Sequence, residues 1–331
     1  MSATRASAER PPAWRGERTL RVGISSCLLG EKVRWDGGHK RDGFLASELG
    51  RFVEWLPVCP EVEVGMGIPR PSVRLVRDGD DVRMLENKTD RDHTRAMRAY
   101  ARRRVAEIAE LDLCGYVLKK DSPSCGMERV KVYRAGTPAV RDGRGLFAQA
   151  LLAALPSLPV EEEGRLNDAP LRENFIERIF AYRRLRDLFA SDWRLGDVVT
   201  FHTAHKLQLM AHTPKAYAEL GRLVAEMKRL PRAELRSRYE TGFMSALAKR
   251  ATPGRNANVL EHMAGYVSER LDAAQRSEIQ DLIRDYRIGL VPLLVPLTLV
   301  RHHARRLDVS YLLGQVYLDP HPKELMLRNH V

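Results

Sequence analysis

The sequence contains no long apolar run and no apolar segment near its start. Its most apolar stretch, residues 288–300, is interrupted by Pro292 and Pro296 and is shorter than the ~20 residues that a membrane helix needs. Residues 1–18 hold four arginines and two prolines but lack the apolar core of a secretory signal. They are predicted to form a mobile basic tail. Together the two absences predict a cytoplasmic protein.

Cysteines are few, and no two of the four form a C-x-x-C pair, so neither a zinc knuckle nor a thioredoxin motif is indicated. In a reducing compartment they indicate thiol or metal chemistry rather than disulfides. Cys27, Cys59 and Cys125 each stand in a turn rich in Gly, Pro or Ser. Cys114 lies within an apolar run and is expected to be an inert core thiol. Three thiolates at turns would suit an iron–sulfur cluster with one open iron; the alternative is free thiols at strand ends.

The length of 331 residues exceeds the usual size of one core and predicts two domains. In the first, residues 19–158, short β-rich segments end near Cys27 and Cys59. A helical pattern over 89–113 then leads into a strand around Val117. This alternation predicts an α/β fold with a Rossmann-like parallel sheet. Ligands of such sheets bind beyond the carboxyl ends of the strands, where all three turn cysteines are expected.

The second half of the chain is expected to be helical. Residues 159–170 are predicted to be a linker, because prolines and three consecutive glutamates interrupt the apolar pattern. Residues 171–331 show amphipathic helical spacing and are predicted to form an all-α domain. There His202, His205 and Lys206 are expected on adjacent helical turns, where they could contact RNA or phosphate, take part in packing or, for the histidines, hold a metal. The net charge of +12 supports a nucleic-acid partner without proving one.

Three segments carry a family resemblance. Residues 22–40 contain Gly-Ile-Ser-Ser-Cys-Leu-Leu-Gly, residues 59–71 begin with Cys-Pro-Glu-Val-Glu, and residues 119–126 read Lys-Lys-Asp-Ser-Pro-Ser-Cys-Gly. Together these segments, within residues 20–150, resemble the thiouracil desulfidase family. The rest of the chain resembles a helical domain often fused to it, as in the bacterial desulfidases that act on 4-thiouridine in tRNA.

The resemblance implies a cofactor and catalytic residues. It implies a 4Fe-4S cluster held by Cys27, Cys59 and Cys125, with the fourth iron open to the sulfur of the substrate. It also implies catalytic roles for Glu61 and Ser122, and thiolated tRNA as the partner of the helical domain. Asp121 stands where the family more often has a basic or small residue.

The residues themselves are consistent with such chemistry. An iron without a protein thiolate is a Lewis acid that suits a soft thiocarbonyl sulfur, and a nearby carboxylate could act as general base for water. Other readings stay open. The chain could act on free thiouracil or thiouridine, could be an iron–sulfur redox or sensor protein with a fourth ligand, or could be a noncatalytic RNA-binding protein.

Overall fold

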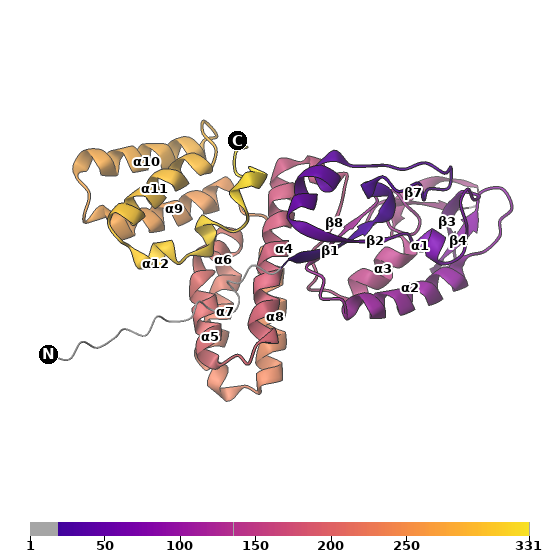
Figure 1. Cartoon of the computed structure of the whole chain (residues 1–331), viewed down its shortest axis with the longest axis horizontal. Coiled ribbons are helices and arrows are strands. Elements are labelled where there is room, and N and C mark those ends of the chain that lie inside the picture. Colours follow the sequence, from indigo (N-terminus) through magenta and orange to yellow (C-terminus); the bar gives the residue numbers. More distant parts are fainter. Residues whose placement is uncertain (1–18, 135, 331) are drawn as a thin grey trace. The chain divides into compact units, whose positions relative to one another are not determined.

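The computed structural model describes residues 19–134 and 136–330, so the predicted basic tail, 1–18, lies outside the described residues. Within that part, the chain divides into two units. An α/β unit comprises residues 19–179 together with 321–330, and a helical unit comprises residues 180–320 (Figure 1). The division falls inside one helix, α4 (Ala169–Ala190).

Sheet A is the parallel sheet of the α/β unit. Its four strands run in the order β2-β1-β5-β8, and every neighbouring pair is parallel. All four residues of β5 are buried and β1 is almost as buried, as expected for strands covered on both faces. The finding confirms the predicted α/β class. The strands are β1 (Leu20–Ser25), β2 (Val53–Val58), β5 (Gly115–Leu118) and β8 (Val160–Glu162).

A second, mixed sheet, sheet B, was not predicted. Its order is β4-β3-β6-β7, with β3 and β6 parallel and the two outer pairs antiparallel. Leu75 and Met84 are fully buried, but charged residues dominate the flanking positions of both strands, which hides the β pattern in the sequence. The strands are β3 (Val73–Asp78), β4 (Asp81–Glu86), β6 (Val130–Arg134) and β7 (Thr137–Gly143).

Three helices and several short turns complete the body of the α/β unit. Helix α2 buries Met97, Tyr100 and Ile108 at helical spacing, and the Tyr100 ring lies 6.3 Å from the Phe147 ring of α3. The helices are α1 (Pro60–Glu63), α2 (Thr94–Ala109) and α3 (Leu146–Ala154); the short turns are η2 (Ser26–Leu29), η3 (Phe44–Glu48), η4 (Leu49–Arg51), η5 (Arg165–Asn167) and η8 (Lys323–Leu325).

Residues 159–170 fold into the α/β unit instead of forming a linker. They contain β8, the turn η5 and the start of α4. Glu161, Glu162 and Glu163 are all buried, because each carboxylate has partners. Glu163 pairs with Lys119 at 2.5 Å, and Glu162 accepts a bond from the Met127 amide at 2.7 Å. The acidic run therefore anchors the loop after β5.

Residues 321–330 also depart from the predicted all-α domain, 171–331, because they group with the α/β unit. The Arg328 Nε donates to Glu173 Oε1 at 3.1 Å, and His330 Nε2 lies 3.4 Å from Glu173 Oε2. The end of the chain thus packs against the first half of α4.

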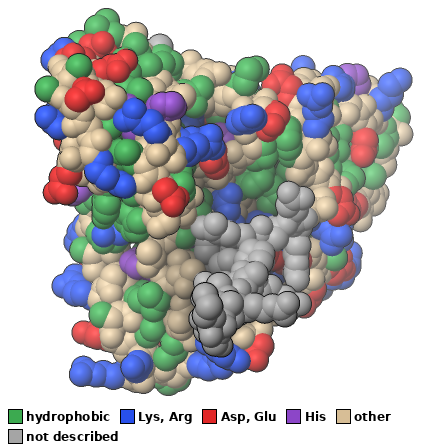
Figure 2. Space-filling view, turned by 60° about the vertical axis from the view of Figure 1, so that its left-hand side comes forward, with side chains coloured by type: hydrophobic (Ala, Val, Ile, Leu, Met, Phe, Trp, Pro, Cys, Tyr) green, Lys and Arg blue, Asp and Glu red, His purple; other side chains and the backbone are tan. Residues whose placement is uncertain are grey.

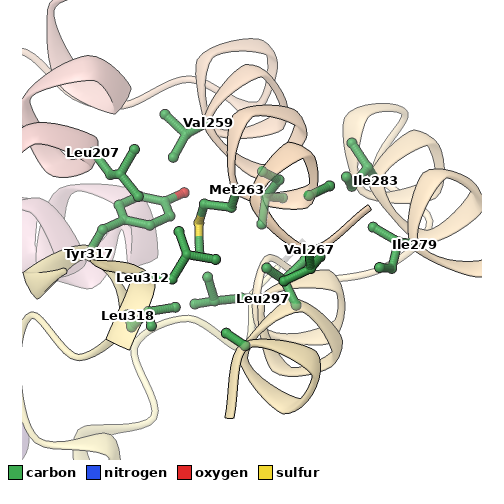
Figure 3. Packing of buried hydrophobic residues seen from close by; sticks show 14 of the residues in the cluster. Leu207, Val259, Met263, Val267, Ile279, Ile283, Leu297, Leu312, Tyr317 and Leu318 are labelled. Atoms are coloured by element: carbon green, nitrogen blue, oxygen red, sulfur yellow. The ribbon is translucent and has the colours of Figure 1, made fainter. Parts of the chain in front are cut away.

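The helical unit contains no strand among its described residues, as predicted. Its core includes Leu207, Met263 and Tyr317, which point toward one another in Figure 3. No helix in the described ranges has both the length and the apolarity needed to cross a membrane. After α4, the elements are α5 (Leu195–Ala204), α6 (Lys206–His212), α7 (Pro214–Glu226), η6 (Met227–Arg229), α8 (Arg232–Leu247), α9 (Pro253–Ser268), α10 (Ala273–Arg287), α11 (Leu294–Arg306), α12 (Ser310–Leu313) and η7 (Val316–Leu318).

Candidate functional site

Three loops at the carboxyl ends of sheet A strands bring the turn cysteines to one cavity. β1 leads into η2, which carries Cys27; β2 leads directly to Cys59; and β5 leads into the loop that carries Cys125. All three line a cavity of ≈ 520 Å³. Cys114 precedes β5, is fully buried and does not line this cavity.

Local sequence explains why each cysteine stands in a turn. Gly30 ends η2 with φ +102°, a conformation that glycine adopts without strain. Cys59 is the N-cap of α1, and Pro60 follows at the first helical position, where its missing N–H costs nothing. The Cys59 amide donates to Glu63 Oε1 at 3.1 Å. At Gly145 a Cβ would come within 2.4 Å of the Ser124 carbonyl, so only glycine lets α3 start against the Cys125 loop.

Burial determines the protonation of the three cavity thiols. Loss of solvent raises the pKa of Cys27 to about 11, although the Lys119 charge acts in the opposite direction. Burial likewise raises the pKa of Cys59 and, most strongly, of Cys125. With no cation bound, the three thiols stay protonated at neutral pH. A soft metal group bound to sulfur would supply the positive charge that thiolates need here.

Glu61 is held in a fixed position beside the cysteines. Arg70 donates from Nε and Nη2 to Glu61 Oε2 at 3.0 and 2.6 Å, and the Arg70 side chain is only 3% exposed. The other carboxylate oxygen, Oε1, accepts a bond from Ser124 Oγ at 2.7 Å. Oε2 already accepts two bonds, whereas Oε1 keeps a further lone pair for a proton or a water molecule. Sequence reasoning missed both partners, although both lie inside the motifs that carry the resemblance.

Ser122 belongs to the same hydrogen-bonded chain. Its Oγ accepts from the amides of Ser124 and Cys125 at 3.2 and 3.1 Å and lies 2.9 Å from Ser124 Oγ. Because the Ser124 hydroxyl proton goes to Glu61, the Ser122 proton is left for Ser124. Ser122 therefore shapes the Cys125 turn and is connected to Glu61 through Ser124.

For the desulfidase that the resemblance implies, removing either hydroxyl should slow the reaction without removing the cluster. We expect Ser122→Ala and Ser124→Ala to keep their iron and sulfide content but lose most turnover, since Ser124→Ala removes the bond to Glu61 and Ser122→Ala removes the hydroxyl that orients Ser124. Ser72→Ala is a matched control, because Ser72 lines the same cavity but does not belong to the hydrogen-bonded series of Ser122, Ser124 and Glu61. Iron analysis and sulfide release on the three variants check the prediction. Wild-type turnover in Ser124→Ala would contradict it.

Asp121 also lines the cavity, and its partner explains the unusual residue. Arg141 donates to Asp121 Oδ1 at 2.7 Å, and this bond lowers the pKa of the carboxyl. Asp121 has φ +59°, which Asp adopts more readily than most residues. The acidic side chain therefore neutralises one arginine at the rim.

Of the three residues predicted to contact RNA, the structure brings His202 and Lys206 to one ring, that of Tyr217, and buries His205. His205 lies between α5 and α6, is fully buried, and its Nδ1 lies 2.7 Å from the Phe201 carbonyl oxygen, so it has no surface for RNA. His202 Nδ1 lies 3.1 Å from Tyr239 Oη, and burial lowers its pKa to about 4. Lys206 lies over the Tyr217 ring at 5.8 Å. His202 is therefore neutral at physiological pH, and only Lys206 brings a charge.

The alternative of a histidine metal pair gains nothing from the geometry. In the ranges that the structure describes, no three His, Cys, Asp or Glu side chains gather closely enough to hold a single metal ion.

On the face drawn in Figure 2, Lys and Arg side chains are interspersed with Asp and Glu rather than gathered in one field.

Comparisons with known proteins match each half of the chain to a different protein family. The family model of 2-thiouracil desulfurase matches residues 22–163, and that of DUF1722, a protein family of unknown function, matches residues 206–322. The uncharacterized protein YbgA of Escherichia coli (strain K12) is 31% identical over 153 residues, which span 46% of this chain and 90% of that protein. The uncharacterized protein YbbK of Bacillus subtilis (strain 168) is 27% identical over 44% of this chain and 97% of its own length.

Among solved structures, the 4Fe-4S-dependent thiouracil desulfidase TudS is similar at 28% identity. The match covers 48% of this chain and all of that chain, with a TM-score of 0.38. By the family matches, the chain belongs to the 2-thiouracil desulfurase family through residues 22–163 and to the DUF1722 family through residues 206–322.

Proposed function

We propose that this protein is an iron–sulfur-dependent desulfidase that converts thiolated uracil to uracil and sulfide, with 4-thiouridine in tRNA as its substrate. One observation carries the proposal. Three thiols from three separate turns line one cavity together with an ion-paired carboxylate, in a domain of the 2-thiouracil desulfurase family. The net charge of +12 supports tRNA as the partner.

The donor set fits a 4Fe-4S cluster. Cys27, Cys59 and Cys125 offer soft sulfur ligands, which favour iron–sulfur clusters over hard cations. Each thiolate of a cluster binds a different iron, so the thiols need not converge on one point as they would around a single ion. Cys114 is buried at the amino end of β5 and does not line the cavity, so it is not available as a fourth ligand. When bound, the cluster would supply a Lewis-acidic iron for the sulfur of the substrate.

The protein side chains would manage water and protons. Hydrolysis of a C=S bond needs a base that takes a proton from water, and later a donor that returns one. Glu61 is placed for both steps, because Arg70 stabilises its charge and Ser124 fixes its orientation. Ser122 and Ser124 give Glu61 a hydrogen-bonded path to the Cys125 turn. In balance, water supplies oxygen to the carbon, and sulfur leaves as sulfide.

The decisive experiment compares three substrates on one preparation. The full chain is reconstituted anaerobically, and sulfide release is measured with tRNA containing 4-thiouridine, with free 4-thiouridine and with free 2-thiouracil. We expect the largest kcat/KM on tRNA. Sulfide release from the free compounds alone would assign the enzyme to free thiobases instead. A cluster without release would indicate a redox or sensor protein, and no cluster would indicate a noncatalytic RNA-binding protein.

The helical unit is proposed to add affinity for tRNA. Of the residues first considered, Lys206 and the partly exposed His202 remain candidates for contacts with RNA. Contacts of this kind depend on salt, because lysine and arginine release counterions from phosphate.

A further inference from the structure

Two large aromatic side chains are exposed at the cysteine cavity. Trp35 is 46% exposed and Tyr133 is 40% exposed, and both line this cavity. They come from different parts of the unit, since Trp35 lies in the loop after η2 and Tyr133 lies on β6 of sheet B. In the described part of the chain, neither ring stacks on another ring. Exposed aromatics at a cavity indicate a binding surface, because folding alone favours their burial.

Tyr266 provides a contrast in the helical unit. It is 47% exposed, yet its ring stacks on Tyr311 at 4.8 Å. Exposure of Tyr266 is therefore accompanied by an intramolecular partner. Trp35 and Tyr133 offer their faces to a ligand instead.

The same cavity is strongly basic. Eight Lys and Arg side chains line it, against two carboxylates, Glu61 and Asp121. Five of the eight cations are paired with carboxylates. The other three, Lys40, Lys120 and Lys131, are exposed and have no carboxylate within ion-pair distance in the described part of the chain.

A free thiobase carries no phosphate for the three unpaired lysines to contact. Aromatic faces combined with lysines suit a nucleic acid, since bases stack on the rings and phosphates contact the cations. Building on the proposed desulfidase function, we propose that this rim binds the nucleotides that flank the thiolated base in an RNA strand. The α/β unit thus contacts RNA itself, with Trp35 and Tyr133 as stacking platforms and Lys40, Lys120 and Lys131 as phosphate contacts.

The rim is also connected to the catalytic carboxylate. The Arg70 amide donates to the Trp35 carbonyl oxygen at 3.0 Å, and the Arg70 side chain holds Glu61. A nucleotide stacked on Trp35 would therefore restrict the motion of the Trp35 backbone. Through the hydrogen bond to the Arg70 amide, it would also restrict Arg70, which positions Glu61. This link predicts that flanking nucleotides improve turnover as well as affinity.

The test uses the full chain and two readouts. Affinity for a short, single-stranded, unmodified oligoribonucleotide is measured across a salt series, and kcat/KM is measured on its 4-thiouridine version and on free 4-thiouridine. We expect Trp35→Ala and Tyr133→Ala each to weaken binding about tenfold or more. We expect Lys131→Ala to reduce the salt slope by about one. On the thiolated oligonucleotide, kcat/KM should fall at least about tenfold further than on the nucleoside.

Matched variants distinguish the loss of stacking from misfolding and from a general loss of positive charge. Trp35→Phe and Tyr133→Phe retain a ring and should restore most of the affinity, which separates stacking from misfolding. Arg102→Ala removes an exposed cation of α2 that does not line the cavity, and should leave binding unchanged.

Three outcomes would count against the proposal or its basis. Unchanged affinity in the alanine variants would overturn the rim as an RNA site. Equal losses on oligonucleotide and nucleoside would place the rings on the thiobase itself and overturn the flanking role. If wild-type protein releases sulfide from no substrate, the proposed function fails, whereas the affinity series still decides whether the rim binds RNA.

Discussion

Alanine at Cys27, Cys59 or Cys125 is expected to abolish the iron–sulfur chromophore, whereas Cys114→Ala should retain it. The reason is position, because the first three thiols line the cavity and Cys114 is buried at the other end of β5. A variant that lacks one ligand has only two thiolates left to hold the cluster. The cluster in turn stabilises the negative charge of each buried thiolate, so losing it weakens the remaining bonds as well. Iron and acid-labile sulfide contents of the four variants, with their visible spectra, check the prediction.

Folding must be measured alongside cluster content. Cys114 is fully buried, so removal of its sulfur lowers stability modestly through the space left behind. A thermal melt shows whether each variant is folded. A folded Cys114→Ala protein without iron would contradict the assignment, as would a folded Cys59→Ala protein with its full iron content.

Glu61→Gln should lose about 100- to 10,000-fold in turnover while keeping its cluster, a range typical of general acid–base groups. The amide has nearly the shape of the carboxylate and keeps an oxygen for Ser124 or Arg70, so geometry changes little. What disappears is the base. Single-turnover sulfide release by iron-loaded protein measures the effect without interference from product release.

The Glu61→Gln substitution also affects stability, because Glu61 is the ion-pair partner of Arg70. A second variant separates this effect from the effect on turnover. Glu61→Gln leaves the buried Arg70 guanidinium without its carboxylate, and an unpaired buried charge is destabilising. The double variant Glu61→Gln, Arg70→Met removes that charge and should recover stability but not turnover. Near-normal single-turnover rates in the iron-loaded Glu61→Gln protein would remove Glu61 from the mechanism.

Local patterns were sufficient to predict three of the four strands of sheet A, whereas β8 lay in the predicted linker. The short apolar segments at residues 20–24 and 51–58 and around Val117 become three of its strands, because buried parallel strands have continuous apolar sequences. Sheet B escaped prediction, since Leu75 and Met84 alternate with charged residues that find ion-pair partners only after folding. The glutamates at 161–163 misled for the same reason, because their partners lie up to 44 residues away in the loop after β5.

The site shows the same division between local and distant information. The turn cysteines were found because Gly, Pro and Ser mark turns in the sequence itself. Ser124 was missed as a partner of Glu61 because 63 residues separate the two in the sequence. The helix expected to present His202 and His205 together is interrupted at His205, whose fully buried ring packs edge-on against Phe243 of α8. No periodicity within one segment predicts contacts of this kind.

The grouping of residues 321–330 with residues 19–179 makes the helical unit an insertion in the α/β unit. A stop codon near Gly164 would therefore remove α4 and residues 321–330 along with the helical unit, and with them the ion pair between Glu173 and Arg328. Deletion of residues 180–320 would instead keep both parts of the α/β unit in the chain. At the level of the gene, one continuous segment therefore encodes the helical unit, and the codons of the α/β unit lie on both sides of it.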